Sequence, residues 1–205
     1  LMAMLLINAC KERDTATFDV PVPHLHAKLP DDKFAILKIE GEFVDIMCEA
    51  NPEHKDDVRF ENGKKFLHVQ ILRALCGMIK SALSWCTLCT EVLHKEGFEL
   101  NPYDRCVANK VTNGKQCTIG WYVDDNILSH VERSVVDGVI NKIEEYFPGL
   151  VVERGKDLNF LGMEIGFFEK GKLTLGLVPY ISDMIEELEE ALKLYGEDLN
   201  RDYSH

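Results

Sequence analysis

Residues 118–130 read TIGWYVDDNILSH, and this segment gives the clearest indication of the fold. Two runs of apolar, largely β-favouring residues, 119–123 and 127–128, flank the short polar sequence Asp124-Asp125-Asn126. Such a pattern predicts a tight β-hairpin that carries both carboxylates at its tip. Because like charges close together repel, the two acids need either a nearby cation or free solvation.

Two interpretations of this acidic tip are open. Mg²⁺ prefers carboxylate oxygens and commonly shares them with substrate phosphates, so the pair is a candidate metal site. Asp and Asn are also ordinary turn formers, so the same residues fit a solvated turn. The hairpin alone does not separate the two interpretations.

The composition is that of a folded protein with a sizeable core. The chain has 205 residues, of which 46% are hydrophobic and 9% aromatic. The sequence begins with Leu1, so we expect the reading frame to start upstream. The apolar run 2–9 is too short for a membrane helix and lacks a basic leader. We therefore interpret it as the end of a buried helix, and we predict no membrane partner.

Charge and cysteine usage restrict the function further. There are 35 acidic and 23 basic residues, a formal net charge of −12, which argues against tight nucleic-acid binding by overall charge. A nucleic-acid enzyme with a negative net charge needs basic surface from parts outside this chain. The seven cysteines are an odd number without secretory context, so we expect reduced thiols in an intracellular protein. Cys86 and Cys89 lack a second ligand pair at zinc spacing, and core packing is favoured for them.

Periodicity predicts a mixed fold. We expect strands over 17–20, 34–39, 64–72, 106–111, 116–123, 160–168 and 172–177, and helices over 43–50, 79–93, 134–147 and 180–194. Asn113-Gly114 is the strongest hairpin signal, and Ser134-x-x-Asp137 predicts a capped helix start. Without repeats or linkers, residues 1–205 are predicted to form a single domain. Strands joined by hairpins with helices between them indicate an α+β fold with an antiparallel sheet and helices on one face.

With its motifs in this order, the chain resembles the reverse transcriptase domain of copia-type retrotransposons from about Asp14 to Leu188. Tyr122-Val123-Asp124-Asp125 is similar to the Tyr-Val-Asp-Asp hairpin of that family. Phe18-Asp19-Val20 is similar to the strand that carries its first catalytic Asp. The other similar segments are Leu75-Cys76-Gly77-Met78 with Trp85, Gly97-Phe98 with Asp104 and Cys106, Phe160-Leu161-Gly162-Met163-Glu164-Ile165, and Tyr180-Ile181.

The resemblance implies an RNA-directed DNA polymerase with a palm and partial fingers, an incomplete thumb and no RNase H domain. It implies catalysis by two Mg²⁺ ions, which Mn²⁺ can replace, held by Asp19, Asp124 and Asp125. Asp19 and Asp124 would bridge the ions, and Asp125 would contribute more weakly. The implied partners are an RNA or DNA template with its primer, deoxynucleoside triphosphates and the rest of the retrotransposon polyprotein. The implied location is a cytoplasmic virus-like particle.

Further site residues are carried over from the same resemblance. Phe160, Leu161, Gly162 and Met163 would form the primer grip. His24, Lys80 and Tyr122 would contact the substrate: His24 stands five residues after Asp19, where the family has an aromatic gate against ribonucleotides, and Lys80 could approach a phosphate.

The sequence also departs from the family pattern. Pro23 precedes His24, and Leu83 stands where the family commonly has an arginine, which removes a guanidinium contact. These departures, with the acidity, favour the alternative of a non-catalytic remnant that keeps the fold as a structural or protein-interaction module. A metal-dependent nuclease or phosphatase would need acids or histidines from other segments that we do not find, and it ranks lowest. The segment 196–205 has no counterpart in the family, and we expect it to fray.

Overall fold

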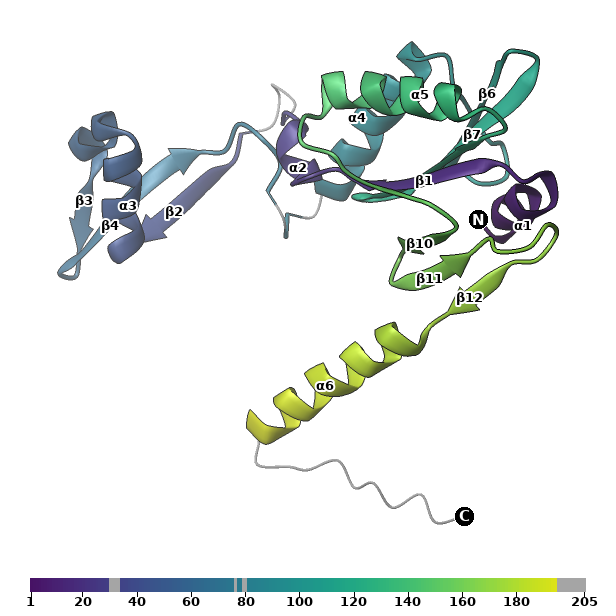
Figure 1. Ribbon diagram of the computed structural model, residues 1–205. Coiled ribbons are helices and arrows are strands. Elements are labelled where there is room, and N and C mark those ends of the chain that lie inside the picture. Colours follow the sequence, from purple (N-terminus) through teal and green to yellow (C-terminus); the bar gives the residue numbers. More distant parts are fainter. Residues whose placement is uncertain (30–33, 76, 79–80, 195–205) are drawn as a thin grey trace. The chain divides into compact units, whose positions relative to one another are not determined.

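The computed structural model describes residues 1–29, 34–75, 77–78 and 81–194 (Figure 1). The chain divides into two compact units, each with a sheet of its own. The larger comprises residues 1–21 and the described residues from 90 onward, and the smaller comprises 22–89. The predictions for Lys80 and for the segment 196–205 lie outside the described residues.

A six-stranded antiparallel sheet forms the centre of the larger unit, in the order β5-β6-β7-β8-β1-β9. Its strands are β1 (Asp14–Asp19), β5 (Glu99–Leu100), β6 (Val107–Thr112), β7 (Lys115–Tyr122), β8 (Asp125–His130) and β9 (Val151–Arg154). The three strands predicted over 17–20, 106–111 and 116–123 are confirmed, with small shifts at their ends. β1 lies between β8 and β9, so strand pairing joins segments that are far apart in the sequence.

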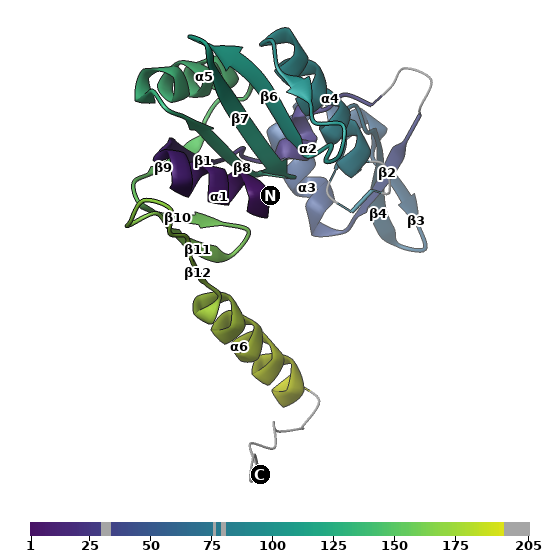
Figure 2. The same ribbon diagram turned by 90° about the vertical axis from the view of Figure 1, so that its right-hand side faces the viewer.

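Helices lie on both faces of this sheet, and not on one face as the sequence predicts. α5 (Arg133–Tyr146) packs on β1 and β8 and buries Val136, Val139, Ile140 and Ile143. The end of α4 (Ser81–Lys95) lies close to the end of α5. Tyr146, the last residue of α5, donates a hydrogen bond at 3.1 Å to the carboxylate of Glu96, which follows α4. α1 (Met2–Lys11) occupies the opposite face, where Met4 and Leu5 join Ile127 in one core cluster (Figure 2).

The structure corrects the prediction of one strand over 160–168. The segment forms two strands, β10 (Asp157–Phe160) and β11 (Met163–Gly166), and a third, β12 (Thr174–Gly176), completes the sheet. Leu161 and Gly162 form the turn, with φ angles of 55° and 71°. A two-residue hairpin turn favours positive φ at both positions. The apolar pattern runs through the turn without a break, which explains why periodicity did not reveal it.

The capping prediction for α5 is also wrong. The residue before the helix is Glu132, not Ser134, and no side chain caps the first turn. α6 (Val178–Leu194) follows β12 and confirms the predicted final helix. No side chain of α6 is buried.

The smaller unit has a three-stranded antiparallel sheet in the order β2-β4-β3. Its elements are α2 (Pro23–His26), β2 (Ile36–Glu40), α3 (Glu42–Ala50), the 3-10 helix η1 (Pro52–Asp57), β3 (Arg59–Glu61) and β4 (Lys64–Gln70). Val44 and Cys48 of α3 pack with Leu67 of β4 in its core. The predicted α+β class with antiparallel sheets is therefore confirmed. None of the helices in the described ranges is long and apolar enough to span a bilayer.

Candidate active site

Asp19 and Asp125 meet at one end of the larger sheet. Asp19 is the last residue of β1, Asp125 is the first of β8, and the two are direct partners in the antiparallel ladder. Tyr122 of β7 pairs with Asp125 on the other side. Directly opposed residues point to the same face, and so do residues two apart on one strand. Both acids therefore point to the face of Ile127, which is the face that α1 covers.

The turn between β7 and β8 holds the third predicted acid. Val123 and Asp124 form a two-residue loop, and Val123 has a φ of 54°. A β-branched residue rarely adopts a positive φ, and such strain is characteristic of functional turns. The carbonyl of Asp124 accepts a hydrogen bond from the Val20 amide at 3.1 Å. The hairpin tip is thereby tied to the chain that leaves β1.

Asn126 strengthens this connection. Its side chain is 3% exposed, and Nδ2 donates to the carbonyl of Phe18 at 3.2 Å and to the carbonyl of Asp124. In the sequence Asn126 looks like an ordinary polar residue of a turn, and no local pattern distinguishes it. In the structure it holds β8 and the acidic turn against β1.

The acids perturb one another. Burial raises the pKa of the Asp125 carboxyl to about 6, and the charges of Asp19 and Asp124 and a hydrogen bond with Asp19 add to the rise. A hydrogen bond between two carboxyl groups needs one shared proton. The site therefore concentrates negative charge in a partly desolvated position, where a cation would be favoured.

The side chains that the structure describes do not form a complete metal cage. Within the described part of the chain, no group of three or more His, Cys, Asp and Glu side chains is placed to hold one metal ion. Asp19 and Asp125 are paired, whereas Asp124 is exposed in the neighbouring turn. Three ionised carboxylates are not expected to converge without a cation between them. The donors present are carboxylate oxygens, which suit a hard divalent cation.

The turn of the β10–β11 hairpin lies beside the paired acids. A cleft of about 80 Å³ is lined by Thr17, Phe18, Asp19, Asp125, Val151, Glu153, Asn159, Phe160, Leu161 and Gly162. Three of the four predicted grip residues thus share a cleft with Asp19 and Asp125. Met163 does not line the cleft; like Leu161, it packs against the core cluster that contains Phe160.

Glu153 is a further acid of this cleft that the sequence did not single out. It pairs with Thr17 across β9 and β1, so it points to the same face as Asp19. Its carboxylate accepts a hydrogen bond from the Asn159 amide at 3.2 Å, which links β9 to the β10–β11 hairpin. β9 is short, and its pairing with a strand near the N-terminus leaves no local signal in the sequence.

The predicted substrate-contacting residues lie in different parts of the chain. Tyr122 ends β7 beside Asp125 and is 61% exposed. His24 belongs to α2 of the smaller unit, and its buried Nδ1 has no hydrogen-bond partner among the residues that the structure describes. The substrate-contact roles of Tyr122, His24 and Lys80 stay predictions.

Solved structures of yeast telomerases resemble this chain weakly. Apo telomerase from Candida tropicalis has a TM-score of 0.46 at 11% identity over 84% of this chain and 35% of that chain. Its form truncated from the C-terminal domain has a TM-score of 0.44 at 11% identity, over 85% and 39%. Telomerase from Candida albicans, in complex with a fragment of telomeric RNA, has 0.41 at 11%, over 84% and 34%. This chain spans less than half the length of each.

The model of the family described as reverse transcriptase (RNA-dependent DNA polymerase) matches residues 39–194, well over half of the chain. The match includes the acidic hairpin and the β10–β11 hairpin, and it begins after Asp19. The chain belongs to the reverse transcriptase family, in its copia-type branch.

Proposed function

We propose that the larger unit is the palm of an RNA-directed DNA polymerase that adds deoxynucleotides to the 3′ end of a primer. One observation carries this proposal: Asp19 and Asp125, far apart in the sequence, are direct neighbours on adjacent strands. Asp124 stands in the adjoining turn, close enough to raise the pKa of Asp125. A structural acid pair without such a role would be costly, because it places like charges together in a partly buried position.

The donor set fits divalent cations. Asp19, Asp124 and Asp125 would hold two Mg²⁺ ions, or Mn²⁺ in their place, and the ions would supply activation of the primer hydroxyl and stabilisation of the leaving pyrophosphate. The protein contributes the positions of the carboxylates. The Val123 turn, the Val20–Asp124 hydrogen bond and Asn126 hold the hairpin acids beside β1.

The β10–β11 turn would hold the primer end. Phe160, Leu161 and Gly162 line it together with Asp19 and Asp125, so a strand held on the β10–β11 turn would present its terminus to the acids. Tyr122 would border the incoming nucleotide. The partners would be template, primer, deoxynucleoside triphosphates and the rest of a copia-type polyprotein in a cytoplasmic particle. With a net charge of −12, other parts must supply basic surface for the template.

Primer extension on a poly(rA) template with an oligo(dT) primer tests the proposal, in Mg²⁺ and in Mn²⁺. Asp19→Asn and Asp124→Asn should each lower extension by at least about a hundredfold, because each removes a charged metal ligand at nearly constant shape. Asp157→Asn is the matched control, since Asp157 is an exposed acid in β10. Extension that survives both substitutions would refute the assignment of these carboxylates.

A non-catalytic remnant is the second candidate. Pro23 and Leu83 depart from the family pattern, and Leu83 is 65% exposed, where an arginine could have met a phosphate. If the chain is such a remnant, primer extension should be absent even when the chain is joined to the rest of its polyprotein. A circular dichroism spectrum of the same preparation should show a folded protein, which rules out misfolding as the cause of the missing activity.

A further inference from the structure

An apolar groove lies in the smaller unit between β2 and α3. It has a volume of about 330 Å³, which lies in the range of ligand pockets. Residues 37–40 of β2 line it together with Phe43, Ile46 and Met47 of α3. Phe43 is 69% exposed and Ile46 is 57% exposed, so large apolar side chains meet solvent here. A contiguous apolar surface of this kind is typical of an interaction site.

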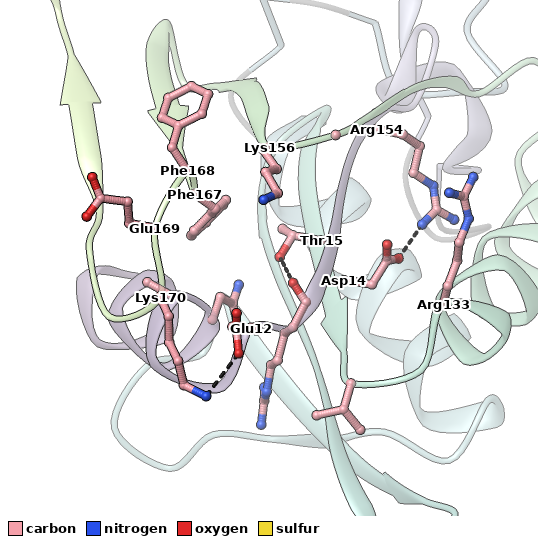
Figure 3. A pocket seen from close by; sticks show the side chains of 15 residues that line it. Glu12, Asp14, Thr15, Arg133, Arg154, Lys156, Phe167, Phe168, Glu169 and Lys170 are labelled. Atoms are coloured by element: carbon pink, nitrogen blue, oxygen red, sulfur yellow. Dashed lines mark hydrogen bonds and ion pairs between the residues drawn. The ribbon is translucent and has the colours of Figure 1, made fainter.

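A cleft of the larger unit differs in kind, although its volume of about 380 Å³ is similar (Figure 3). Charged side chains make up most of its lining. Asp14 pairs with Arg154 at 2.6 Å and Glu12 pairs with Lys170 at 2.9 Å, and Figure 3 shows both interactions. Polar groups that already satisfy one another have little to offer a ligand. The β2–α3 groove instead offers exposed apolar side chains.

β2 is an edge strand, and its outer side offers main-chain hydrogen-bonding groups. Among the described residues it pairs with β4 alone. The amides of Ile71 and Gly41 donate to the carbonyls of Ala35 and Lys65, at 2.9 Å and 3.2 Å. Because the bonded positions of an antiparallel pair alternate, every second residue from 35 to 41 faces β4. The residues between them direct their N–H and C=O groups to the free edge: Ile36, Lys38 and Glu40.

The groove lies on the α3 face of this edge. Ile39 pairs with the core residue Leu67, so Ile39 and Leu37 point toward α3. Alternate side chains point to opposite faces, so Lys38 lies on the other face. There its ammonium lies 4.6 Å from the centre of the Phe66 ring. A lysine often protects an exposed strand edge, but this one is held away from the groove.

Acidic side chains border the groove along α3. Glu42 stands four residues before Ile46 and Glu49 three residues after it, so both are its neighbours on the helix surface. Both are exposed, and no ion pair joins either of them to a residue that the structure describes. The third acid of the helix, Asp45, is paired with Lys65. Basic side chains on a partner would complement this border.

We propose that the free edge of β2 binds an extended peptide segment of another protein, which adds a fourth strand to the small sheet. The segment carries apolar side chains at every second position, with basic side chains beside them. Its main chain bonds to the outward groups of β2, its apolar side chains fill the groove against α3, and its basic side chains meet Glu42 and Glu49. The surface includes none of the acids of the candidate active site, so this proposal stands independently of the polymerase proposal.

A second copy of β2 fits the edge less well than such a segment. In an antiparallel pair centred on the strand, Lys38 of one copy would lie opposite Lys38 of the other, and like charges in direct opposition destabilise a strand pair. The residues that a second copy would turn toward the groove are Ala35, Leu37, Ile39 and Gly41. None of them is a base that could meet the acids of α3.

Fluorescence anisotropy of a labelled peptide, Lys-Thr-Val-Thr-Ile-Thr-Val-Thr-Lys, titrated with the whole chain tests the proposal. The peptide places its valines, isoleucine and lysines on one face. Phe43→Ser and Ile46→Ser should each weaken binding about tenfold, because each removes apolar area that the peptide would cover. Both side chains are more than half exposed, so the variants are expected to fold. Phe60→Ser is the control, since Phe60 is 75% exposed on β3 at the opposite edge of the sheet.

Two N-methylated forms of the peptide test the main-chain contacts. In an antiparallel pair, opposed residues share a face, so the threonines would lie opposite the outward residues of β2 and bond to them. Methylation of the threonine amides should abolish binding, whereas methylation of the valine and isoleucine amides should leave it nearly unchanged. In the NMR spectrum, the peptide should slow hydrogen exchange of the Lys38 amide, which faces the free edge, and not of the Leu37 amide, which faces β4.

The outcomes separate the alternatives. Loss of binding on methylation of one set of amides alone supports strand addition, antiparallel for the threonine set and parallel for the other. Equal binding of all three peptides overturns the proposal, and so does binding that Phe43→Ser and Ile46→Ser leave unchanged, tighter binding of a peptide with glutamate in place of lysine, or no binding at about 1 mM peptide. A dimer of the free chain that Ile46→Ser disrupts would assign the edge to a second copy and also overturn it. Asp19→Asn should abolish primer extension and leave peptide binding intact, so the two proposals can fail separately.

Discussion

Asp125→Asn should stabilise the metal-free protein at neutral pH, although it removes a proposed catalytic carboxylate. Burial, the charges of Asp19 and Asp124, and the hydrogen bond with Asp19 raise the pKa of Asp125 from 3.8 to about 6. At about 1.4 kcal/mol for each pKa unit, the ionised group costs the folded state about 3 kcal/mol. Because the carboxyl keeps contact with water, we discount this to about 1–2 kcal/mol.

The sign of the effect defines a pH window. At pH 7 Asp125 is ionised in both the folded and the unfolded state, and the folded state carries the whole penalty. As the pH falls from about 6 to about 4, the folded state takes up its proton first, so the wild-type free energy of unfolding rises relative to that of the variant. The advantage of Asp125→Asn should therefore be largest at pH 7 and disappear near pH 4.

Urea unfolding at pH 7 and at pH 4.5, in EDTA, measures this difference. Asp157→Asn serves as the control, because it removes one exposed carboxylate from the same unit without touching the acid pair. Addition of millimolar Mg²⁺ should stabilise the wild type more than the Asp125 variant. A variant that is less stable than the wild type at pH 7, or a difference that does not change with pH, would refute the electrostatic reasoning.

Two further substitutions test the geometry around the acids. Gly162→Ala should lower the free energy of unfolding by about 1–3 kcal/mol, because the new Cβ would lie 2.7 Å from Tyr180 Cδ2 in addition to the strain of a φ of +71°. Gly171 is the control: it has a similar φ of +74°, but an added Cβ would meet no atom within 4 Å, so Gly171→Ala should lower the free energy of unfolding by only about 1 kcal/mol. Equal losses of unfolding free energy in the two variants would refute the close contact with Tyr180. Asn126→Ala should cost about 1–3 kcal/mol in urea unfolding and reduce primer extension, because it leaves two main-chain oxygens without their donor. Full extension activity in that variant would show that the hairpin tip does not need this support.

Much of the local structure could be predicted from the sequence. The hairpins at Asn113-Gly114 and at the acidic turn, and the helices α3, α4, α5 and α6, are present within a few residues of their predicted positions. Turn chemistry and hydrophobic periodicity are properties of neighbouring residues, so they can be read from one chain. The same method missed the Leu161–Gly162 turn, because apolar residues occupy it and the period continues through it.

The arrangement of the candidate sites required the tertiary structure. Asp124 and Asp125 are adjacent in the sequence, and their chemistry alone predicted a carboxylate-bearing turn. Only the insertion of β1 between β8 and β9 places Asp19 opposite Asp125 and brings Glu153 to the same face. The apolar residues of β2 and α3 likewise look like ordinary core positions in the sequence, and only the place of β2 at the edge of its sheet leaves several of them exposed beside outward main-chain groups. Local sequence determines which strands and turns form, whereas pairing between distant strands and the burial of individual charges depend on contacts that exist only in the folded chain.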